Sequence, residues 1–233
     1  MTDNKEMSLF EHLEELRERL IKSGLALMFT TLVSLLFSTQ LIKIILVPAG
    51  DVRPVFLRPT EGVLTYFRVA LLAGVALALP FVTYQVAQFV LPGLRPSEKR
   101  FLIWLLPGAV VSFVAGAAFA YFVMLPPSLR FLVSFGSEVA EATWAIGEYI
   151  AFVTNLMFWT GVVFEAPLLA FFLAKLGIVT SEMLSRNRKY ALLVSAILAA
   201  VITPTPDPFN MMLVMAPLIV LFEVSVWVTK LAR

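Results

Sequence analysis

Residues 149–174 read YIAFVTNLMFWTGVVFEAPLLAFFLA, and this stretch is long enough to cross a bilayer as one helix. The hydrocarbon core of a bilayer is about 30 Å thick, and about 20 mainly apolar residues span it as a helix. A single carboxylate, Glu165, interrupts the stretch. Because an ionisable side chain at membrane depth is costly, Glu165 is a candidate functional residue.

The whole chain has the composition of a membrane protein. Hydrophobic residues make up 60% and charged residues 15% of its 233 residues, and the mean hydropathy is +0.89. Only helices or closed barrels satisfy their backbone polar groups in lipid, and segments of this length predict an all-α fold in one integral membrane domain, residues 1–233. Six spans are expected near Ile21–Val47, Leu64–Leu91, Phe101–Leu125, Tyr149–Ala174, Tyr190–Thr203 and Phe209–Val228.

Prolines and small residues indicate how these helices pack. The prolines inside the spans predict kinks and a concave bundle; they are Pro80, Pro107, Pro167 and Pro217. Small residues such as Gly74 and Gly116 would let helix backbones approach closely. The last two spans are short, because the segment between Lys189 and Pro204 reaches only about 21 Å as a helix.

The basic residues are distributed unevenly between the two predicted sides. If the N-terminus lies on one side, that side receives Lys5, Arg17, Arg19, Lys22, Arg95, Lys99, Arg100, Lys175, Arg186, Arg188, Lys189, Lys230 and Arg233. The other side holds Lys43, Arg53, Arg58, Arg68 and Arg130. The positive-inside rule therefore places both termini in the cytoplasm. The expected location is the cytoplasmic (inner) membrane.

A cluster of acids precedes the first span. Ser8 and Glu11 have the spacing of a capping box, and residues 8–20 are expected to form an amphipathic cytoplasmic helix. Its Glu15 has two interpretations: a member of a solvated charged face, paired with Arg19 one turn away, or a site for a basic peptide. Glu98 is predicted on the same side of the membrane, where it could stabilise a helix N-terminus or flank the same patch as Glu15.

The sequence carries no signature of an enzyme. It lacks the residue patterns of intramembrane proteases and of phosphate-binding loops, so we expect no catalysis, no cofactor and no nucleic-acid partner. Glu165 keeps three interpretations: a hydrogen bond to a group such as Thr154, Asn155 or Thr160, a proton carrier, or a contact site for a partner helix. The alternative function is therefore a proton- or ion-coupled channel or transporter subunit that uses Glu165.

Several motifs, in order along the chain, resemble the TatC family, the multispanning receptors of the twin-arginine protein translocase. They are His12 to Leu20, Pro80 to Gln85 with Phe89, Pro92-Gly93-Leu94, Glu98-Lys99-Arg100, Phe113 to Pro126, Phe164-Glu165-Ala166-Pro167, Thr203 to Asp207 and Pro217 to Glu223. The resemblance implies a receptor for signal peptides with two consecutive arginines, which starts the export of folded proteins. It also implies that the proton motive force drives export.

The resemblance also assigns roles to residues. Glu15 and Glu98 would contact the twin-arginine motif, and the patch would be shaped by Leu16, Arg17, Phe89, Lys99 and Arg100. Glu165 would face a polar group of a partner helix. The implied partners are twin-arginine signal peptides and single-span TatA-like and TatB-like subunits, with the chain as a homo-oligomer within a hetero-complex in the lipid bilayer.

Overall fold

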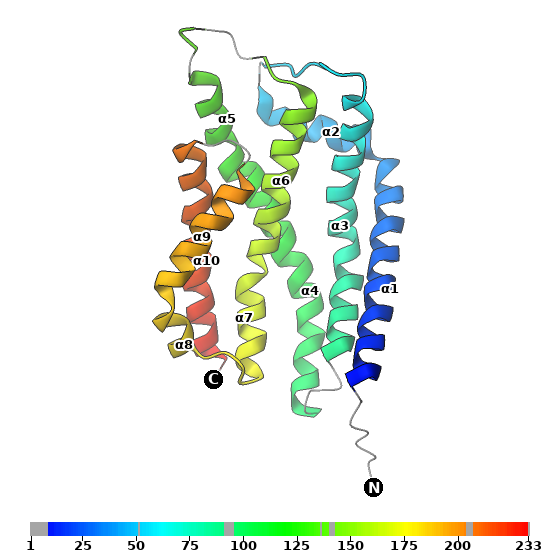
Figure 1. The fold of residues 1–233 in the computed structure, drawn as a ribbon, viewed down its shortest axis with the longest axis vertical. Helices are drawn as coiled ribbons and strands as arrows, with labels where there is room; N and C mark the ends of the chain where they lie inside the picture. The colour runs from blue at the N-terminus through cyan, green and yellow to red at the C-terminus, as the bar shows by residue number, and fades with distance from the viewer. Residues whose placement is uncertain are drawn as a thin grey trace.

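The computed structural model describes residues 9–50, 52–90, 96–135, 137–139, 143–203 and 207–232, and helices dominate it (Figure 1). The α-helices are α1 (Leu9–Leu35), α2 (Ser38–Leu46), α3 (Glu61–Val90), α4 (Pro96–Phe119), α5 (Leu125–Ser134), α6 (Ile146–Phe164), α7 (Ala166–Lys175), α8 (Ser181–Arg186), α9 (Arg188–Ile202) and α10 (Pro208–Leu231). A 3₁₀ turn, η1 (Val47–Ala49), follows α2, and a π-helical segment, η3 (Ala120–Met124), joins α4 to α5. The predicted all-α fold class is confirmed.

Four of the described helical stretches are long and apolar enough to cross a membrane: Glu61–Phe89, Leu105–Ser134, Ile146–Lys175 and Pro208–Leu231. A fifth arises if α1 and the α2 segment count as one bent span. Of the last two spans, both expected to be short, only the first is: helix α9 has 15 residues, about 22 Å of helix. Helix α10 has 24 residues, about 36 Å, and is long enough to cross a bilayer, so the expectation is wrong for the last span. The count of six spans and their bounds stay predictions.

The span expected over Ile21–Val47 is bent in the structure. Helix α1 ends at Leu35, and α2 leaves it at an angle of 76°. No proline or glycine lies at the break, where Leu36 and Phe37 donate backbone hydrogen bonds to the carbonyls three residues before them. The last turn of α1 is therefore tightened at the bend, and contacts with other helices determine the direction of α2.

Two tyrosines supply those contacts. The Tyr121 hydroxyl donates to the Ile44 carbonyl at 2.7 Å, and the buried Tyr149 hydroxyl donates to the Ile45 carbonyl at 2.8 Å. Pro48 has no N–H for the Ile44 carbonyl, which accepts from the Val47 N–H instead, and the Tyr121 hydroxyl is a second donor to it. Tyr121 belongs to the π-helical segment η3 and Tyr149 to α6. Their two hydrogen bonds hold α2 against these elements.

The prolines differ in their effect. Helices α3, α4 and α10 run without interruption through Pro80, Pro107 and Pro217. At Pro167 the helix does break, because α6 ends at Phe164 and α7 begins at Ala166. Proline cannot donate to the carbonyl four residues earlier, and this lost bond accounts for a break at Glu165.

Glycines set the closest helix contacts, as predicted for Gly74 and Gly116. A Cβ on Gly74 of α3 would lie 2.8 Å from the Thr31 Cα of α1. On Gly116 of α4 it would lie 2.7 Å from the Thr160 carbonyl oxygen of α6. The Thr30 hydroxyl also donates to the Gly74 carbonyl at 2.8 Å, so α1 and α3 pack backbone to backbone.

The first turns of α1 and α4 and the last turns of α3, α7 and α10 lie at one end of the bundle, which we call the α1 end (Figure 1). At the opposite end, residue 55 forms a short parallel bridge with residue 145. There the Val55 N–H donates to the Trp144 carbonyl, and the Ile146 N–H donates to the Val55 carbonyl, both at 2.9 Å. The segment before α3 and the segment before α6, which are distant in the sequence, are thus hydrogen-bonded to each other at this end.

Candidate functional site

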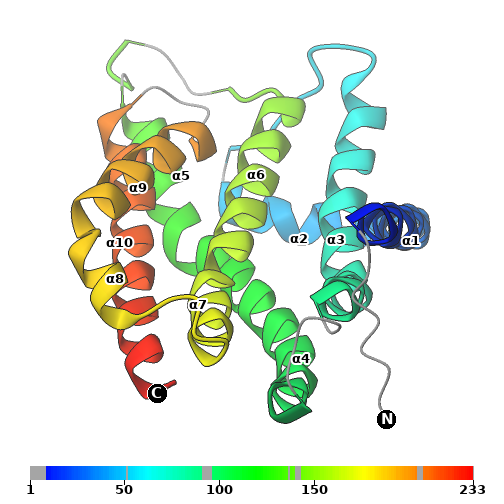
Figure 2. The same cartoon turned by 60° about the horizontal axis from the view of Figure 1, so that its bottom comes forward.

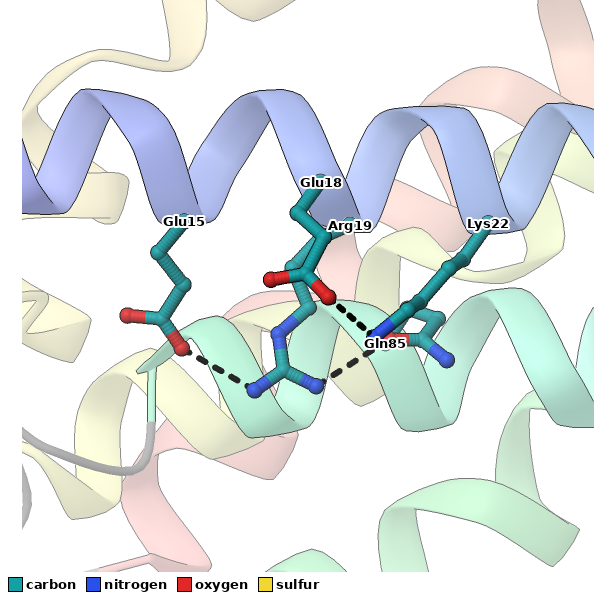
Figure 3. Close-up of polar contacts among 5 residues, drawn as sticks. All are labelled: Glu15, Glu18, Arg19, Lys22 and Gln85. Atoms are coloured by element: carbon teal, nitrogen blue, oxygen red, sulfur yellow. Dashed lines mark hydrogen bonds and ion pairs between the residues drawn. The ribbon is translucent and has the colours of Figure 1, made fainter.

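The predicted acidic residue Glu15 lies on α1 and points towards α3 (Figure 3). Its side chain is only 15% exposed, and its Oε1 accepts a hydrogen bond from Nη2 of Arg19 at 3.0 Å. The other oxygen, Oε2, is buried and accepts no hydrogen bond from the described residues. The Glu15–Arg19 pair expected from the spacing is therefore confirmed, but it satisfies one carboxylate oxygen only.

Arg19 connects this carboxylate to α3. Its Nη1 donates to Oε1 of Gln85 at 3.1 Å, and Gln85 is 5% exposed (Figure 3). One guanidinium thus spans a charged acceptor on its own helix and a neutral acceptor on the next. The close packing of α1 on α3 makes this bridge possible, because it brings the two helix faces within side-chain reach.

A second ion pair lies one turn further along α1. Lys22 Nζ is 2.6 Å from Glu18 Oε1, and both side chains are exposed (Figure 3). The hydrogen bond and the charge of Lys22 lower the pKa of the Glu18 carboxyl below its ordinary value. Glu18 is therefore ionised and already paired with Lys22, and Glu15 is the more buried carboxylate of the two.

Aromatic stacking fixes the α1 end of the same interface. The His12 ring stacks on Phe89 of α3 with centroids 4.3 Å apart, and His12 lies one turn from Glu15 on the same helix face. Leu16 is half-buried beside them, whereas Arg17 is exposed on another face of α1. The structure therefore gathers Glu15, Leu16 and Phe89 and leaves Arg17 at the surface.

Glu98, Lys99 and Arg100 belong to the first turns of α4, and their side chains lie outside the described residues. The connection at 91–95 lies outside them too, and so does Ser8 of the predicted capping box. Figure 2 shows the first turn of α4 at the end of the bundle where α1 begins. The backbone thus places these residues at the same end as Glu15.

Sequence reasoning missed three neighbours of Glu15 as site residues. His12 and Gln85 were visible only as parts of longer motifs, and Arg19 only as a charge partner. For His12 and Arg19 the helical spacing of three and four residues from Glu15 is the signal that could have found them. Gln85 has no such signal, because its contact needs the register of α1 against α3.

Glu165 sits in the break between α6 and α7. Its backbone N–H donates to the Val162 carbonyl at 3.1 Å, and its carbonyl accepts from the Leu169 N–H at 2.9 Å. Its side chain is half-buried, and Oε1 is buried without a hydrogen bond from any described residue. Two of the three expected partners are engaged elsewhere: the Thr154 hydroxyl donates to the Ile150 carbonyl at 2.6 Å, and the Thr160 hydroxyl to Met124 Sδ at 3.8 Å.

An open cavity of about 350 Å³ lies between α2, α3, α4 and α6. Its wall is apolar and includes Leu41, Ile45, Leu72, Phe113 and Met157. The cavity gives the bundle a hollowed face, in keeping with the predicted concave shape. Among the described residues, no group of three or more histidine, aspartate or glutamate side chains could hold a metal ion.

The fold and these sites define a multi-pass, all-helical membrane protein with a partly buried carboxylate at one end and an isolated carboxylate in the middle of a span-length stretch. The family model of the Sec-independent protein translocase protein TatC matches residues 11–217. The chain belongs to the TatC family, so the resemblance found in the sequence is confirmed.

Known relatives cover nearly the whole chain. A Sec-independent protein translocase protein TatC from Carboxydothermus hydrogenoformans is 40% identical over 99% of this chain and 96% of its own length. A chloroplastic TATC from Pisum sativum is 37% identical over 100% of this chain and 66% of its own length. The crystal structure of a twin-arginine translocase receptor TatC superposes with a TM-score of 0.86 at 35% identity, covering 95% of this chain and 99% of that one.

Proposed function

We propose that this chain is the signal-peptide receptor of a Sec-independent, twin-arginine translocase. The observation that carries the proposal is the Glu15 carboxylate, which is 15% exposed, retains one oxygen without a hydrogen bond from described residues, and lies at the α1 end beside the His12–Phe89 stack. A carboxylate in this setting favours a guanidinium as ligand, because charge-assisted hydrogen bonds are stronger where water is partly excluded.

The proposed binding patch combines the acids of two helices. Glu15 binds one arginine of the twin-arginine motif, and Glu98, near the start of α4, binds the other. Leu16, Arg17, Phe89, Lys99 and Arg100 shape the surroundings, and the exposed Arg17 repels basic segments outside the motif. The hydrophobic part of the signal peptide lies in the apolar cavity, whose volume of about 350 Å³ accommodates several apolar side chains.

The remaining proposals concern orientation and assembly. Both termini face the cytoplasm, so the α1 end is the cytoplasmic end of a protein in the cytoplasmic membrane. TatA-like and TatB-like single-span subunits assemble with the chain, which forms homo-oligomers within that hetero-complex. Glu165 is the polar anchor for a partner helix or for the inserted signal peptide, and the proton motive force supplies the energy.

A crosslinking experiment tests the receptor proposal. A twin-arginine signal peptide with a photoreactive group should crosslink near Glu15 or Glu98 of the full chain in detergent, and the same peptide with two lysines should crosslink weakly. Glu15→Gln should weaken peptide binding about ten- to a hundredfold, the loss of one charge-assisted hydrogen bond. Glu14→Gln removes the same charge from an exposed neighbour and serves as the matched control. Equal crosslinking of the lysine peptide would refute the proposal.

Glu165 also supports the second candidate function, a proton- or ion-conducting subunit, because its Oε1 is buried without a hydrogen bond from described residues. The two functions differ in liposomes that contain this chain alone. A conducting subunit passes protons or ions, and Glu165→Gln stops the flux; absence of flux through the wild-type chain rejects this candidate. Under the receptor proposal, Glu165→Ala leaves twin-arginine binding intact and impairs assembly or export.

A further inference from the structure

We propose that Arg19 is an internal competitor that sets the affinity threshold of this receptor: its guanidinium occupies the Glu15 carboxylate until an arginine of a signal peptide replaces it. The inference rests on the proposed function, because it concerns the same carboxylate. It adds to that function an internal competitor with the same chemical group as the ligand.

The first step of the argument is access to Glu15. Oε1 accepts a hydrogen bond from Arg19 at 3.0 Å, and Oε2 is fully buried (Figure 3). Oε1 can accept one further donor, but a guanidinium that binds both oxygens requires the carboxylate to turn Oε2 out of its buried position. Turning the carboxylate breaks the bond to Arg19, so bidentate binding requires Arg19 to release Glu15.

The second step is that Arg19 keeps a binding partner after this release. Its Nη1 is hydrogen-bonded to Oε1 of Gln85 at 3.1 Å, and its side chain is 24% exposed. Gln85 is neutral, so it holds the guanidinium without a charge that competes with Glu15. Arg19 can therefore exchange its bond to Glu15 for water while Gln85 retains it beside the site.

The third step is the chemistry of the exchange. An incoming arginine replaces a guanidinium by a guanidinium, so the carboxylate keeps a planar donor and one positive charge. A lysine offers a compact, strongly hydrated ammonium without the forked donor geometry. The Glu15 carboxylate therefore prefers an arginine to a lysine, and Arg19 sets the minimum strength that either peptide must reach.

The effect of Arg19 on peptide affinity can be measured. An internal competitor lowers the apparent affinity of every ligand by the same factor, which is the fraction of receptors in which Glu15 is free. Removal of Arg19 should therefore tighten arginine and lysine peptides equally. We expect the binding affinity of both peptides to rise about three- to tenfold. This lies between the effect of an exposed ion pair on a helix and that of a buried charge-assisted hydrogen bond. A residue that contacted the peptide would change the ratio of the two affinities instead.

The experiment measures fluorescence anisotropy of a labelled twin-arginine peptide and its twin-lysine version with the full chain in detergent. Arg19→Gln should raise both affinities three- to tenfold and leave their ratio unchanged. Lys22→Gln removes the same charge one turn away without touching Glu15 and should change affinity less than about twofold, an effect that salt suppresses. Arg19→Lys keeps the charge but offers Glu15 an ammonium without the forked donor geometry, so it should raise both affinities by a smaller factor.

Two results would overturn the inference: Arg19→Gln lowers the affinity for the arginine peptide, or it changes the ratio between the peptides. If Arg19→Gln does not fold, Arg19→Lys decides, since unchanged or weaker binding of this variant contradicts a competitor. Failure of the proposed function has a separate signature. In that case Glu15→Gln binds the arginine peptide as tightly as the wild type does, whatever the Arg19 variant shows.

Discussion

Replacing Gly74 by alanine tests how the α1–α3 contact supports the recognition site. The new Cβ would lie 2.8 Å from the Thr31 Cα, whereas ordinary contacts begin at 3.4 Å. The helices would have to separate locally by about 0.6 Å, because both atoms belong to or adjoin the backbone and neither can turn away. Such a shift also strains the Thr30 hydrogen bond to the Gly74 carbonyl.

The magnitude follows from three contributions. Overpacking costs about 1 to 3 kcal/mol, and weakening one hydrogen bond about 1 kcal/mol. The higher helix propensity of alanine offsets up to about 1 kcal/mol. We therefore expect Gly74→Ala to lower the free energy of unfolding by about 2 kcal/mol. The variant should also weaken twin-arginine binding, because a separation of α1 from α3 extends to Arg19 and Gln85.

The assay is unfolding in mixed detergent micelles by titration with SDS, followed by far-UV circular dichroism. Gly24→Ala is the matched control on α1, since a Cβ there meets nothing within 4 Å. The control should be neutral or more stable by up to about 1 kcal/mol, from propensity alone. If Gly74→Ala is as stable as Gly24→Ala, the close α1–α3 approach is not present in the protein and the reasoning fails.

Three further predictions concern polar contacts. Tyr149→Phe should lower the free energy of unfolding by about 1 to 2 kcal/mol, because a buried carbonyl of α2 loses its donor, and SDS titration measures this. Arg188→Gln should cost less than about 1 kcal/mol despite two hydrogen bonds to Glu223 at 2.7 and 2.8 Å, because the two side chains are 56% and 38% exposed and water screens the pair; a larger loss that persists in high salt would contradict this. Lys22→Gln should raise the pKa of the Glu18 carboxyl towards its ordinary value of 4.5, which carbon-detected NMR titration of labelled glutamate measures. The pKa of Glu18 is lower in the folded chain than in the unfolded chain. The Glu18–Lys22 pair therefore contributes its full stability above the unfolded pKa, and this contribution is lost as the pH falls through the lowered pKa of the folded chain.

The sequence is sufficient for those parts of the fold that depend on local composition. Apolar runs of span length predict the helices, and small residues such as Gly74 and Gly116 predict close crossings that the structure contains. The bend after Leu35 was not predictable, because no helix-breaking residue marks it and its direction depends on hydroxyl donors from Tyr121 and Tyr149. Long-range partners of this kind leave no periodic signal near the bend.

The same distinction applies to the candidate site. Helical spacing alone predicts the Glu15–Arg19 pair, which the structure contains. The bridge from Arg19 to Gln85 joins positions 66 residues apart and depends on the register of two packed helices. Glu165 illustrates the opposite limit, since its depth in an apolar stretch is evident from the sequence, whereas its hydrogen-bond partners are not.

The closure at the far end of the bundle has a consequence for biogenesis. The Tyr149 hydroxyl and the Ile45 carbonyl are 104 residues apart, and residues 55 and 145 form the bridge beside them. At ordinary rates of synthesis, α6 is made on the order of ten seconds after α2, and only then can Tyr149 donate to the Ile45 carbonyl. Helix α2 therefore completes its contacts only after α6 has been made, although it packs on α3 earlier, and an insertion factor that shields the Ile45 carbonyl would act before α6 emerges.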